Sequence, residues 1–531
     1  MLEYRGYDSC GIALIEKGKA FIYKACGNTS GLKNIVDKHI ADLCIGHTRW
    51  ATHGEVSLVN AHPHTTQNNR FIIVHNGVID NYQKLKEEYS IKTISQTDTE
   101  VIVHLLDKFS LIYSDLLEAI KELMKIIEGS YAILIIDKKN DKLYFMKNKS
   151  SLLIAKGKNG ISIASDQIVF ENSSNVLILN DFDYGYIKED IFVCNIFNNN
   201  TRNEFIKSSN RSLHKTTSHY MLDEILYEPT MINKISEEYK KIDLSKLNDL
   251  FNKADEICFV GAGSSFYAGA ILKHKYEQIL NKRCYAVVAS EIASFVITNP
   301  SILFIFLTQS GETLDLCAAQ NMLGGKYKIV ALCNNVNSTI AYNADVVIPL
   351  FAGEEIAVAS TKAFMAMVYV GEIIINPAIL LEKDSIVEKL NTVIEDIRKV
   401  EEAVETITNV SSVFYLGKGI DYQIALEAAL KLREVSYINS FAFYSGELKH
   451  GSIALLDENT LCIGILQNDD FKNSIDNALE EARARRSKTM LIEGDLYSII
   501  MKIELLAYYI ALKLNRSIDQ PRNLAKSVTV N

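Results

Sequence analysis

The sequence predicts a multidomain α/β and α+β protein: a layered α+β domain followed by two tandem, doubly wound parallel-sheet domains. Three observations support this. At about 100–200 residues per domain, 531 residues suit about three domains. The first 200 residues alternate short β-rich runs with polar turns, and the remainder holds a long internal repeat. We expect a layered domain at 1–200, a linker and connecting helix at 201–240, sheet domains at 241–390 and 400–518, and a tail at 519–531.

Composition excludes several classes of protein. With 48% apolar and 23% charged residues, the chain is neither collagen-like nor largely disordered. A net charge of −9 without basic blocks argues against a nucleic-acid partner. The most apolar stretch, 363–381, is interrupted by Glu372 and by Asn376-Pro377, so no membrane span is predicted. Nine scattered cysteines without a CxxC pair predict buried free thiols in the cytoplasm.

The N-terminal region shows strand and helix signals in turn. Apolar runs at 71–74 and 132–136 predict buried strands, and the amphipathic stretch 99–109 predicts a helix. Residues 196–218 are rich in Asn, Ser and Thr and show no sustained apolar period. This segment is therefore the best linker candidate.

The internal repeat defines the rest of the chain. Residues 256–278 resemble residues 412–434 at an offset of 156, so that Gly261 and Gly263 correspond to Gly417 and Gly419. Each copy begins with an apolar strand, continues through G-x-G and enters a helix. The first copy continues with apolar runs at 302–307 and 328–333. Alternating β and α units of this kind predict a parallel, doubly wound sheet.

Three hydroxyl-rich loops stand where strands of the first copy give way to helices. The segment LTQSGET (307–313) is joined by Ser264-Ser265 and by Ser360-Thr361. Backbone N–H groups at a helix start, together with hydroxyls, suit a phosphate monoester. A capped helix, with Glu312 in its first turn, is the simpler alternative for LTQSGET alone. Three such loops at the carboxyl ends of one sheet favour a site the size of a phosphosugar.

Acid–base groups gather in the second copy. Lys431 and Glu434 share one helix face, and Glu447 and His450 repeat their spacing. Beside a sugar phosphate, such groups suit ring opening, imine formation and proton transfer next to a carbonyl. A surface salt bridge is the alternative for Lys431 and Glu434. Composition alone gives Lys526 no role beyond that of a solvated charge.

Five of the eleven histidines lie between His47 and His75. Their spacing contains no i, i+4 pair typical of a metal site, so no metal is predicted. Asn76-Gly77 follows the apolar run at 71–74 and predicts either a simple hairpin turn or an oxyanion hole.

Ten motifs, in order, carry a family resemblance. They are EYRGYDS (3–9), HTRWATHGE (47–55), NAHPH (60–64), HNGVIDN (75–81), TDTEV (97–101), HYMLDEI (219–225), LTQSGET, VASTKAF (358–364), GELKHG (446–451) and DQPRNLAKSVTV (519–530). The chain resembles the glutamine–fructose-6-phosphate aminotransferases, or glucosamine-6-phosphate synthases. The resemblance implies a class II glutamine amidotransferase domain of the Ntn-hydrolase αββα type, then two sugar-isomerase (SIS) domains.

The resemblance also implies roles in the first domain, which would hydrolyse glutamine. Glutamine would be held by Arg49, Thr52, His53, Gly77 and Asp98. Asn76 and Gly77 would form the oxyanion hole, and Trp50 would gate an ammonia channel.

In the isomerase domains, the resemblance implies a sugar-phosphate site made by Ser264, Ser265, Thr308, Gln309, Ser310, Thr313, Val358 and Ser360. Lys526 would form the imine, Glu434 would move a proton between C1 and C2, and Lys431 would assist. His450 would help open the ring from a partner subunit, which implies a homodimer. No metal or other cofactor, nucleic acid or membrane is implied.

Some positions depart from the family pattern. The sequence begins about twenty residues inside it, so the amino-terminal nucleophilic cysteine is not among these residues, and Cys10 does not match its place. Residues 482–503 are shorter than the pattern, so a strand of the second isomerase domain is expected to be lost or abbreviated.

Three functions stay open from the sequence. The first is synthesis of glucosamine 6-phosphate from fructose 6-phosphate and glutamine, the first step of hexosamine biosynthesis. The second is an isomerase or ammonia-dependent enzyme whose glutaminase domain is inactive. The third is a non-enzymatic sugar-phosphate-binding module, which would not need the Glu434, His450 and Lys526 set.

Overall fold

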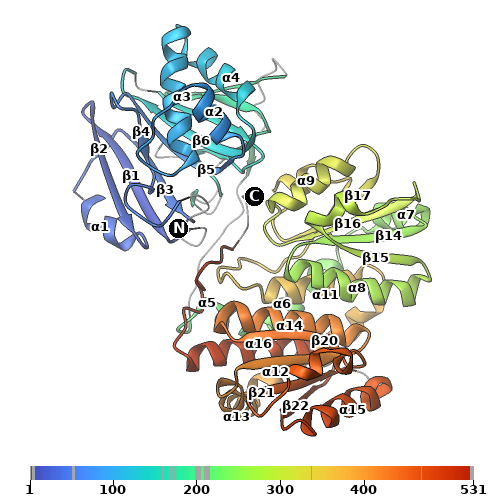
Figure 1. Ribbon diagram of the computed structural model, residues 1–531. Helices are drawn as coiled ribbons and strands as arrows, with labels where there is room; N and C mark the ends of the chain where they lie inside the picture. The colour runs from blue at the N-terminus through green and yellow to red at the C-terminus, as the bar shows by residue number, and fades with distance from the viewer. Residues whose placement is uncertain are drawn as a thin grey trace. The chain divides into compact units, whose positions relative to one another are not determined.

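The computed structural model shows two compact units, Met1–Ser212 with Ser527–Asn531, and Leu213–Lys526. Figure 1 shows the helices and strands of each unit. The structure describes residues 2, 6–36, 38–50, 54–140, 142–157, 160–166, 169–170, 175–197, 205–207, 216–336, 338–467 and 469–526.

The first unit contains three antiparallel sheets, of three, six and four strands. The three-stranded sheet has the order β2-β1-β3, from Lys19–Cys26, Ser9–Glu16 and Leu43–Arg49. The six-stranded sheet has the order β12-β11-β7-β6-β5-β4, from Ile191–Asn195, Asp183–Ile187, Leu143–Asn148, Gly129–Asp137, Phe71–Ile79 and His64–Thr65. The four-stranded sheet has the order β13-β10-β8-β9, from Phe205–Lys207, Asn175–Ile178, Leu153–Gly157 and Gly160–Ala164.

Strand β5 shows how these sheets are layered. Phe71 and Ile73 point to a core shared with the helices, whereas Ile72 and Val74 point to a second core shared with residues of β1 and β3. Because side chains alternate along a strand, an apolar run buries both faces of its sheet. The helices of this unit are α1 (Ser30–Val36), α2 (Tyr82–Glu88), α3 (Asp98–Ile112) and α4 (Leu116–Ile126), and α1 lies against β2. The layered α+β prediction for this region is confirmed.

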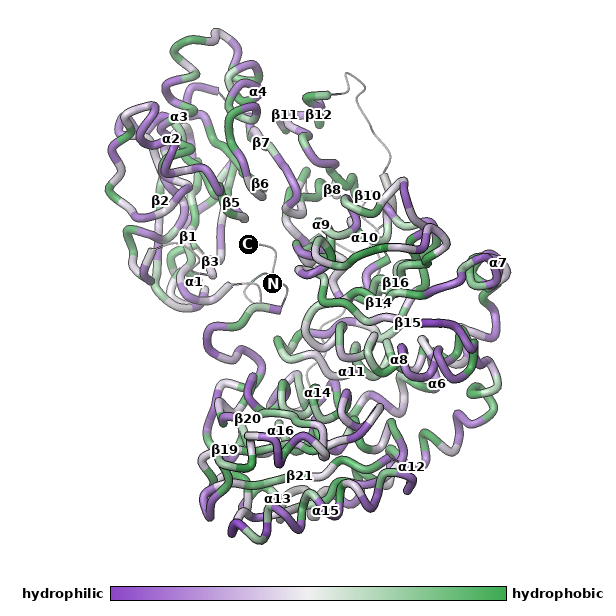
Figure 2. Tube along the Cα trace, turned by 45° about the vertical axis from the view of Figure 1, so that its right-hand side comes forward, coloured by the Kyte–Doolittle hydropathy of each residue, from purple (hydrophilic) through white to green (hydrophobic). Residues whose placement is uncertain are grey.

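The second unit contains two parallel sheets, as the repeat predicts. The first has the order β15-β14-β16-β17-β18, from Arg283–Val288, Glu256–Gly261, Ile302–Thr308, Lys328–Cys333 and Val346–Pro349. Alternate residues of β14 enter cores on opposite faces of this sheet, so helices cover both faces. The central strands β14, β16 and β17 are accordingly apolar except at single end residues (Figure 2). The chain order reverses between β14 and β16, which makes this the topological switch point.

The second sheet has four strands in the order β20-β19-β21-β22, from Asn439–Tyr444, Ser412–Gly417, Thr460–Leu466 and Lys488–Glu493. It therefore has one strand fewer than the first sheet. The α-helices of this unit are α5 (Tyr220–Leu226), α6 (Glu228–Tyr239), α7 (Ser245–Lys253), α8 (Ser264–Leu280), α9 (Leu314–Leu323), α10 (Thr339–Tyr342), α11 (Lys362–Ile373), α12 (Lys383–Glu395), α13 (Ile397–Thr408), α14 (Ile420–Ser436), α15 (Lys472–Arg483) and α16 (Leu496–Lys513). Short 3-10 helices are η3 (Ala289–Ser294), η4 (Pro377–Leu381), η5 (Leu448–His450), η6 (Ser452–Leu455) and η7 (Asp469–Phe471).

The repeated G-x-G turns have the same geometry in both copies. Gly263 and Gly419 have φ values of +55° and +58°, which glycine adopts without strain. A Cβ on Gly261 would lie 2.7 Å from the backbone N of Phe266, so the helix approaches the turn closely. Helices α8 and α14, which follow these turns, pack against each other, and one apolar core includes residues of both copies.

Two sequence predictions need correction. The linker candidate 196–218 contains strand β13, which pairs with β10. The nine cysteines are free, but Cys26 and Cys44 are exposed and Cys194 is half-buried, so burial of every thiol is wrong. These three cysteines lie on β2, β3 and β12, and each of these strands has residues that are partly or fully exposed to solvent. Across the described residues, no helix is both long and apolar enough to cross a membrane.

Candidate active sites

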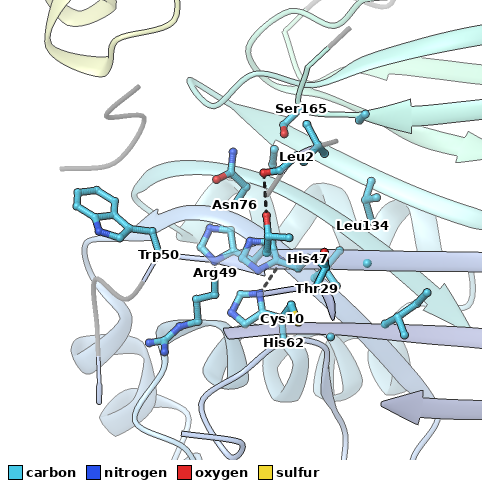
Figure 3. A pocket seen from close by; sticks show the side chains of 18 of the residues that line it. Leu2, Cys10, Thr29, His47, Arg49, Trp50, His62, Asn76, Leu134 and Ser165 are labelled. Atoms are coloured by element: carbon cyan, nitrogen blue, oxygen red, sulfur yellow. Dashed lines mark hydrogen bonds between the residues drawn. The ribbon is translucent and has the colours of Figure 1, made fainter. Parts of the chain in front are cut away.

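A cavity of about 790 Å³ opens in the first unit beside the ends of β3 and β5 (Figure 3). Five residues predicted from the sequence line it, namely Arg49, Trp50, Asn76, Gly77 and Asp98. Cys10 and three histidines line it as well. Thr52 and His53, also predicted to hold glutamine, lie outside the described residues. The cavity thus gathers residues from distant parts of the sequence, from Leu2 to Val169.

Asn76 and Gly77 do not form a turn. They lie inside β5 and pair with Ala132 and Tyr131 of β6 in an unbroken register, so the hairpin-turn prediction is wrong. A glycine is needed at position 77 for another reason. Its φ is +136°, and a Cβ there would lie 2.0 Å from the carbonyl oxygen of Ser130. Only glycine fits this approach of two strands. The Asn76 side chain therefore lines the cavity from a rigid strand.

Asp98 is fixed at the start of α3. Its carboxylate accepts hydrogen bonds from the backbone N–H of Ile79 at 2.8 Å and of Thr99 at 2.8 Å. Arg49, at the end of β3, is buried and interacts electrostatically with Asp98. A carboxylate and a guanidinium at one cavity suit the ammonium and carboxylate groups of a free amino acid.

The histidines form a neutral cluster. The rings of His47 and His62 stack with centroids 4.3 Å apart. Burial lowers the pKa of His47 and of His64 to about 3 and lowers that of His62 well below its ordinary value. Ring nitrogens of His62 and His64 are engaged by the hydroxyls of Thr99 and Thr97. Among the residues that the structure describes, no set of three or more His, Cys, Asp or Glu is arranged to hold a metal ion.

The three hydroxyl-rich loops that were predicted to bind a phosphate lie in the second unit, around the topological switch point. They are called the phosphate-type loops below. Ser264 and Ser265 follow β14, and Thr308 to Thr313 connect β16 to α9. Ser360 precedes α11. In open α/β sheets, ligands bind in the crevice at this point because loops diverge there. The fold therefore brings the three predicted loops to the carboxyl ends of one sheet.

The helix-capping alternative for LTQSGET holds only in part. Thr313 is the N-cap of α9, yet its side chain makes no capping hydrogen bond, and Glu312 lies before the helix. Glu312 instead accepts hydrogen bonds from the N–H and hydroxyl of Thr339, each at 2.9 Å. Thr308 accepts from the N–H of Gly311 at 2.9 Å, which closes the loop. The loop is thus braced by its own contacts, and the Thr313 hydroxyl is not used as a cap.

Lys431 is buried and forms an ion pair with the half-buried Glu434, so the surface salt-bridge alternative is wrong. The Lys431 side chain is 1% exposed, and its Nζ lies 2.6 Å from Glu434 and 3.5 Å from Glu427. Burial opposes the charge, but the Glu434 and Glu427 carboxylates outweigh it and raise the pKa of Lys431. Glu427 also accepts a hydrogen bond from Ser264 at 2.9 Å. Helix α14 is thereby joined to the first phosphate-type loop.

Lys526 lies in a second buried ion pair, with Glu355. Their side chains are 4% and 0% exposed, and Nζ lies 2.5 Å from Oε2. Burial alone would raise the pKa of Glu355, but the Lys526 ammonium lowers it below its ordinary value. The same carboxylate accepts from the hydroxyl of Ser360 and the N–H of Thr361, at 3.3 and 3.0 Å. The amine is therefore held at the loop that precedes α11.

The tail reaches this place through specific contacts. The Asp519 carboxylate accepts from the N–H groups of Tyr220 and Met221, each at 3.0 Å. The N–H of Val358 donates to the Asp519 carbonyl oxygen at 3.0 Å. These bonds tie the tail to the start of α5 and to the VASTKAF segment, which contradicts the reading of Lys526 as a solvated charge.

His450 is the predicted catalytic residue that does not join this group. It is exposed on η5, and the contacts described for Lys431, Glu434 and Lys526 do not include it.

Gln309 is half-buried in the loop after β16, where its backbone carbonyl oxygen accepts from the N–H of Asn335 at 3.2 Å.

Sequence reasoning missed three buried carboxyl groups of this site: Glu224, Glu355 and Glu427. Glu427 lies one helical turn before Lys431, and this i, i+4 spacing would have indicated it. Glu224 accepts hydrogen bonds from the backbone N–H groups of Ile356 and Ala357, beside Glu355. No local pattern marks that contact, because it joins segments 132 residues apart.

Two family models match the chain. The model described as "SIS domain" matches residues 250–377 and 406–510, and the one described as "Glutamine amidotransferase domain" matches residues 47–171. The chain is 36% identical over 580 residues to a glutamine–fructose-6-phosphate aminotransferase (isomerizing) of Staphylococcus aureus, covering 100% of this chain and 96% of that protein. A protein of the same name from Staphylococcus epidermidis is 36% identical over 581 residues, with the same coverage.

Solved structures resemble the second unit. The C-terminal domain of glucosamine-fructose-6-phosphate aminotransferase from Francisella tularensis has a TM-score of 0.54 and 27% identity, covering 57% of this chain and 99% of its own. A tagatose-6-phosphate ketose/aldose isomerase from Escherichia coli has a TM-score of 0.51 at 17% identity, covering 57% and 95%, and shows likeness of fold alone. The full-length identity, both domain matches and the paired parallel sheets agree: this chain belongs to the glutamine–fructose-6-phosphate aminotransferase (isomerizing) family.

Proposed function

We propose that this protein converts fructose 6-phosphate and glutamine to glucosamine 6-phosphate and glutamate, the first step of hexosamine biosynthesis. The observation that carries the proposal is the Lys526–Glu355 pair. A buried amine held beside the phosphate-type loops has the chemistry of an imine-forming group. The buried Lys431–Glu434 pair supplies acid–base groups on the adjoining helix.

The sugar phosphate would bind at the switch point. Its phosphate would take hydrogen bonds from loop N–H groups and from the hydroxyls of Ser264, Ser265, Thr308, Ser310 and Thr313. Gln309, Val358 and Ser360 would contact the remainder of the sugar. This orientation directs the C2 carbonyl of the open-chain ketose toward Lys526.

Lys526 would then attack C2, and water would leave as the imine forms. Ammonia would replace the Lys526 nitrogen on C2, which releases the lysine. Glu434 would take a proton from C1 and return it to C2, leaving an aldehyde at C1 and an amine at C2. Lys431, 2.6 Å from Glu434, would stabilise that carboxylate before the first transfer and after the second.

The cavity of the first unit would bind glutamine. Asp98 would pair with its ammonium and Arg49 with its carboxylate, with Thr52 and His53 completing the site. Asn76 and Gly77 would form the oxyanion hole. Trp50, which also lines the cavity, would gate the passage of ammonia.

Synthesis from fructose 6-phosphate and ammonium tests the isomerase half separately from glutamine use. We expect the unaltered protein to form product, and we expect Lys526→Ala to form it at a rate that is lower by roughly 10³-fold or more. Lys526→Arg is the matched control for charge, because it keeps a cation beside Glu355 but cannot form an imine readily. Full synthesis by Lys526→Ala would exclude the imine role.

We further propose a homodimer in which His450 acts in the partner's site, opening the sugar ring. Its exposure on η5, outside the contacts of Lys431 and Lys526, supports this. Mixing Lys526→Ala with His450→Ala protein under subunit exchange should restore about a quarter of the wild-type activity if sites are shared and exchange is random. No recovery would place His450 in its own subunit's site.

Nine free thiols support a reducing compartment such as the cytoplasm.

Neither alternative function is favoured. A sugar-phosphate-binding module needs the loops alone, yet the structure also buries two lysine–glutamate pairs beside them. Burying such charges costs free energy of desolvation, and a protein that only binds a sugar phosphate does not need them. Relatives named for the complete reaction match the chain across its whole length, including the amidotransferase region.

A further inference from the structure

Two buried carboxyl groups face each other behind the isomerase site. Glu228 begins α6 and Glu504 lies in the middle of α16, and both residues are 0% exposed. Their carboxyl groups interact with each other. The sequence pattern gave neither residue a role, and the mechanism above does not use them.

The two buried carboxyl groups of Glu228 and Glu504 can lie next to each other only if at least one of them carries a proton. None of the four carboxyl oxygens has a hydrogen-bond donor among the residues that the structure describes. Two carboxylates that touch without a donor repel each other, and removing both from water adds a further cost. A single proton between them changes this repulsion into a hydrogen bond, as in the paired carboxyl groups of aspartic proteases.

Charged groups face this pair from two sides. Glu228 interacts with Glu355 and with Lys362, at the loop that holds Lys526. Glu504 interacts with Glu427 and Lys431 on α14. The pair therefore lies between the two buried lysine–glutamate pairs of the isomerase site.

The first copy of the repeat offers an internal comparison. There α11 packs on α8 as α16 packs on α14, and Glu372 of α11 pairs with Lys275, the residue that corresponds to Lys431. Glu372 also accepts from the hydroxyl of Tyr497. Glu372 thus has two donors, whereas Glu504 has none among the described residues and interacts with Glu228.

We propose that Glu228 and Glu504 share one proton and, by doing so, act as positioning residues that keep Lys431 paired with Glu434. With the proton present, Glu504 carries too little charge to draw the ammonium away from Glu434, 2.6 Å distant. When the proton leaves, Glu504 becomes a full carboxylate and competes for Lys431. This effect on catalysis rests on the proposed sugar isomerisation, whereas the shared proton does not.

The direction of the pH effect follows from burial. Burial raises the pKa of Glu228 to about 8, and burial together with the Glu228 carboxyl raises that of Glu504 above its ordinary value. The folded protein then holds a proton that the unfolded chain releases near pH 4.5. The stability that this proton provides is complete below that pH and is lost as the pH rises through about 8.

The first experiment measures thermal unfolding of the whole protein between pH 5 and 9, for wild type, E228Q, E504Q and the double variant E228Q/E504Q. Amides keep the size of the side chains and can hydrogen-bond without a titrating proton. We expect the double variant to lose less of its Tm than wild type between pH 6 and 9. E237Q is the matched control, because Glu237 is an exposed residue of the same helix α6. Parallel pH curves for wild type and the double variant would overturn the shared proton.

The second experiment measures kcat for synthesis from fructose 6-phosphate at a fixed, saturating concentration of free ammonia. Wild type should lose kcat above about pH 8, and E504Q should move that loss upward by about one pH unit or more, with KM for fructose 6-phosphate little changed. E237Q should follow wild type. An unmoved profile in E504Q and in the double variant would overturn the positioning role. If wild type makes no product, the proposed function fails while the thermal result still stands.

Discussion

The hydroxyl of Ser264 donates a hydrogen bond to Glu427 across 2.9 Å, although 163 residues separate them. Ser264 starts the first repeated helix, and Glu427 lies in the second. The bond therefore joins the two copies of the repeat at the candidate isomerase site. Glu427 has its pKa raised to about 7 by burial, and the Ser264 hydroxyl opposes that rise.

Ser264→Ala should destabilise the protein by about 1–2 kcal/mol, because Glu427 would lose the Ser264 hydroxyl as a donor and keep only the longer contact with Lys431. Synthesis should also weaken, since Glu427 would bind a proton at neutral pH and pair less strongly with Lys431. Urea unfolding and steady-state kinetics measure the two effects. Ser265→Ala is the control: it should reduce affinity for fructose 6-phosphate without the loss of stability. Equal stability of both variants would contradict this account.

Glu355→Gln should leave the Lys526 ammonium buried without its counter-charge, at a cost of about 3 kcal/mol at pH 7. Because the pKa of Glu355 is lowered in the folded protein, its contribution is complete above the ordinary glutamate range and is lost as the pH falls below it. The deficit of the variant should therefore shrink at pH 4. Chemical unfolding at both pH values measures it.

A double-mutant cycle with Lys526→Met tests the same pair. Glu355→Gln/Lys526→Met should be more stable than Glu355→Gln alone, because no unpaired charge remains buried. Additive losses would mean that the two residues do not stabilise each other.

Gly311→Ala should reduce both stability and affinity for fructose 6-phosphate. The residue has a φ of +69°, and an added Cβ would lie 1.9 Å from Oγ of Ser338. Gly325→Ala provides a close control, because Gly325 has a φ of +75° but open space around its Cβ position. The control should show the backbone strain of about 1 kcal/mol alone, with normal substrate affinity. Calorimetric titration with fructose 6-phosphate separates the two variants.

Asp98→Asn should weaken binding of L-glutamine by about tenfold or more, since the ammonium of the ligand would lose its counter-charge. Stability should also fall, by about 1–3 kcal/mol, because the amide oxygen accepts from only one of Ile79 and Thr99 and the NH2 group faces the other N–H. Asp107→Asn, on the same helix α3, is the control and should bind glutamine normally. Isothermal titration with glutamine measures both. Unchanged affinity in Asp98→Asn would remove Asp98 from the glutamine site.

Much of this fold follows from local patterns. The apolar run at 328–333 coincides with β17, and the stretch at 99–109 lies within α3. Alternation of strands and helices also places the loops that contain Ser264 and Thr308 together, because parallel strands end at the same edge of a sheet. Position along a strand or helix is sufficient for these predictions.

The buried charges and the strand through Asn76-Gly77 could not be predicted in the same way. Glu355 is buried only because Lys526, distant in the sequence, neutralises it. An Asn-Gly pair ordinarily favours a turn, but here β6 supplies partners on an unbroken ladder and the glycine accommodates a close strand. Such outcomes depend on tertiary contacts that no local window of sequence contains.

The bond between Glu355 and Lys526 also bears on how the protein is made. A ribosome adds Glu355 to the growing chain 171 residues before Lys526. Throughout that interval the carboxyl group must stay hydrated or carry a proton of its own, so the loop before α11 cannot close in its final form. The isomerase pocket is consequently completed late in synthesis, and a nascent chain halted before Lys526 would present an unfinished pocket to chaperones and proteases.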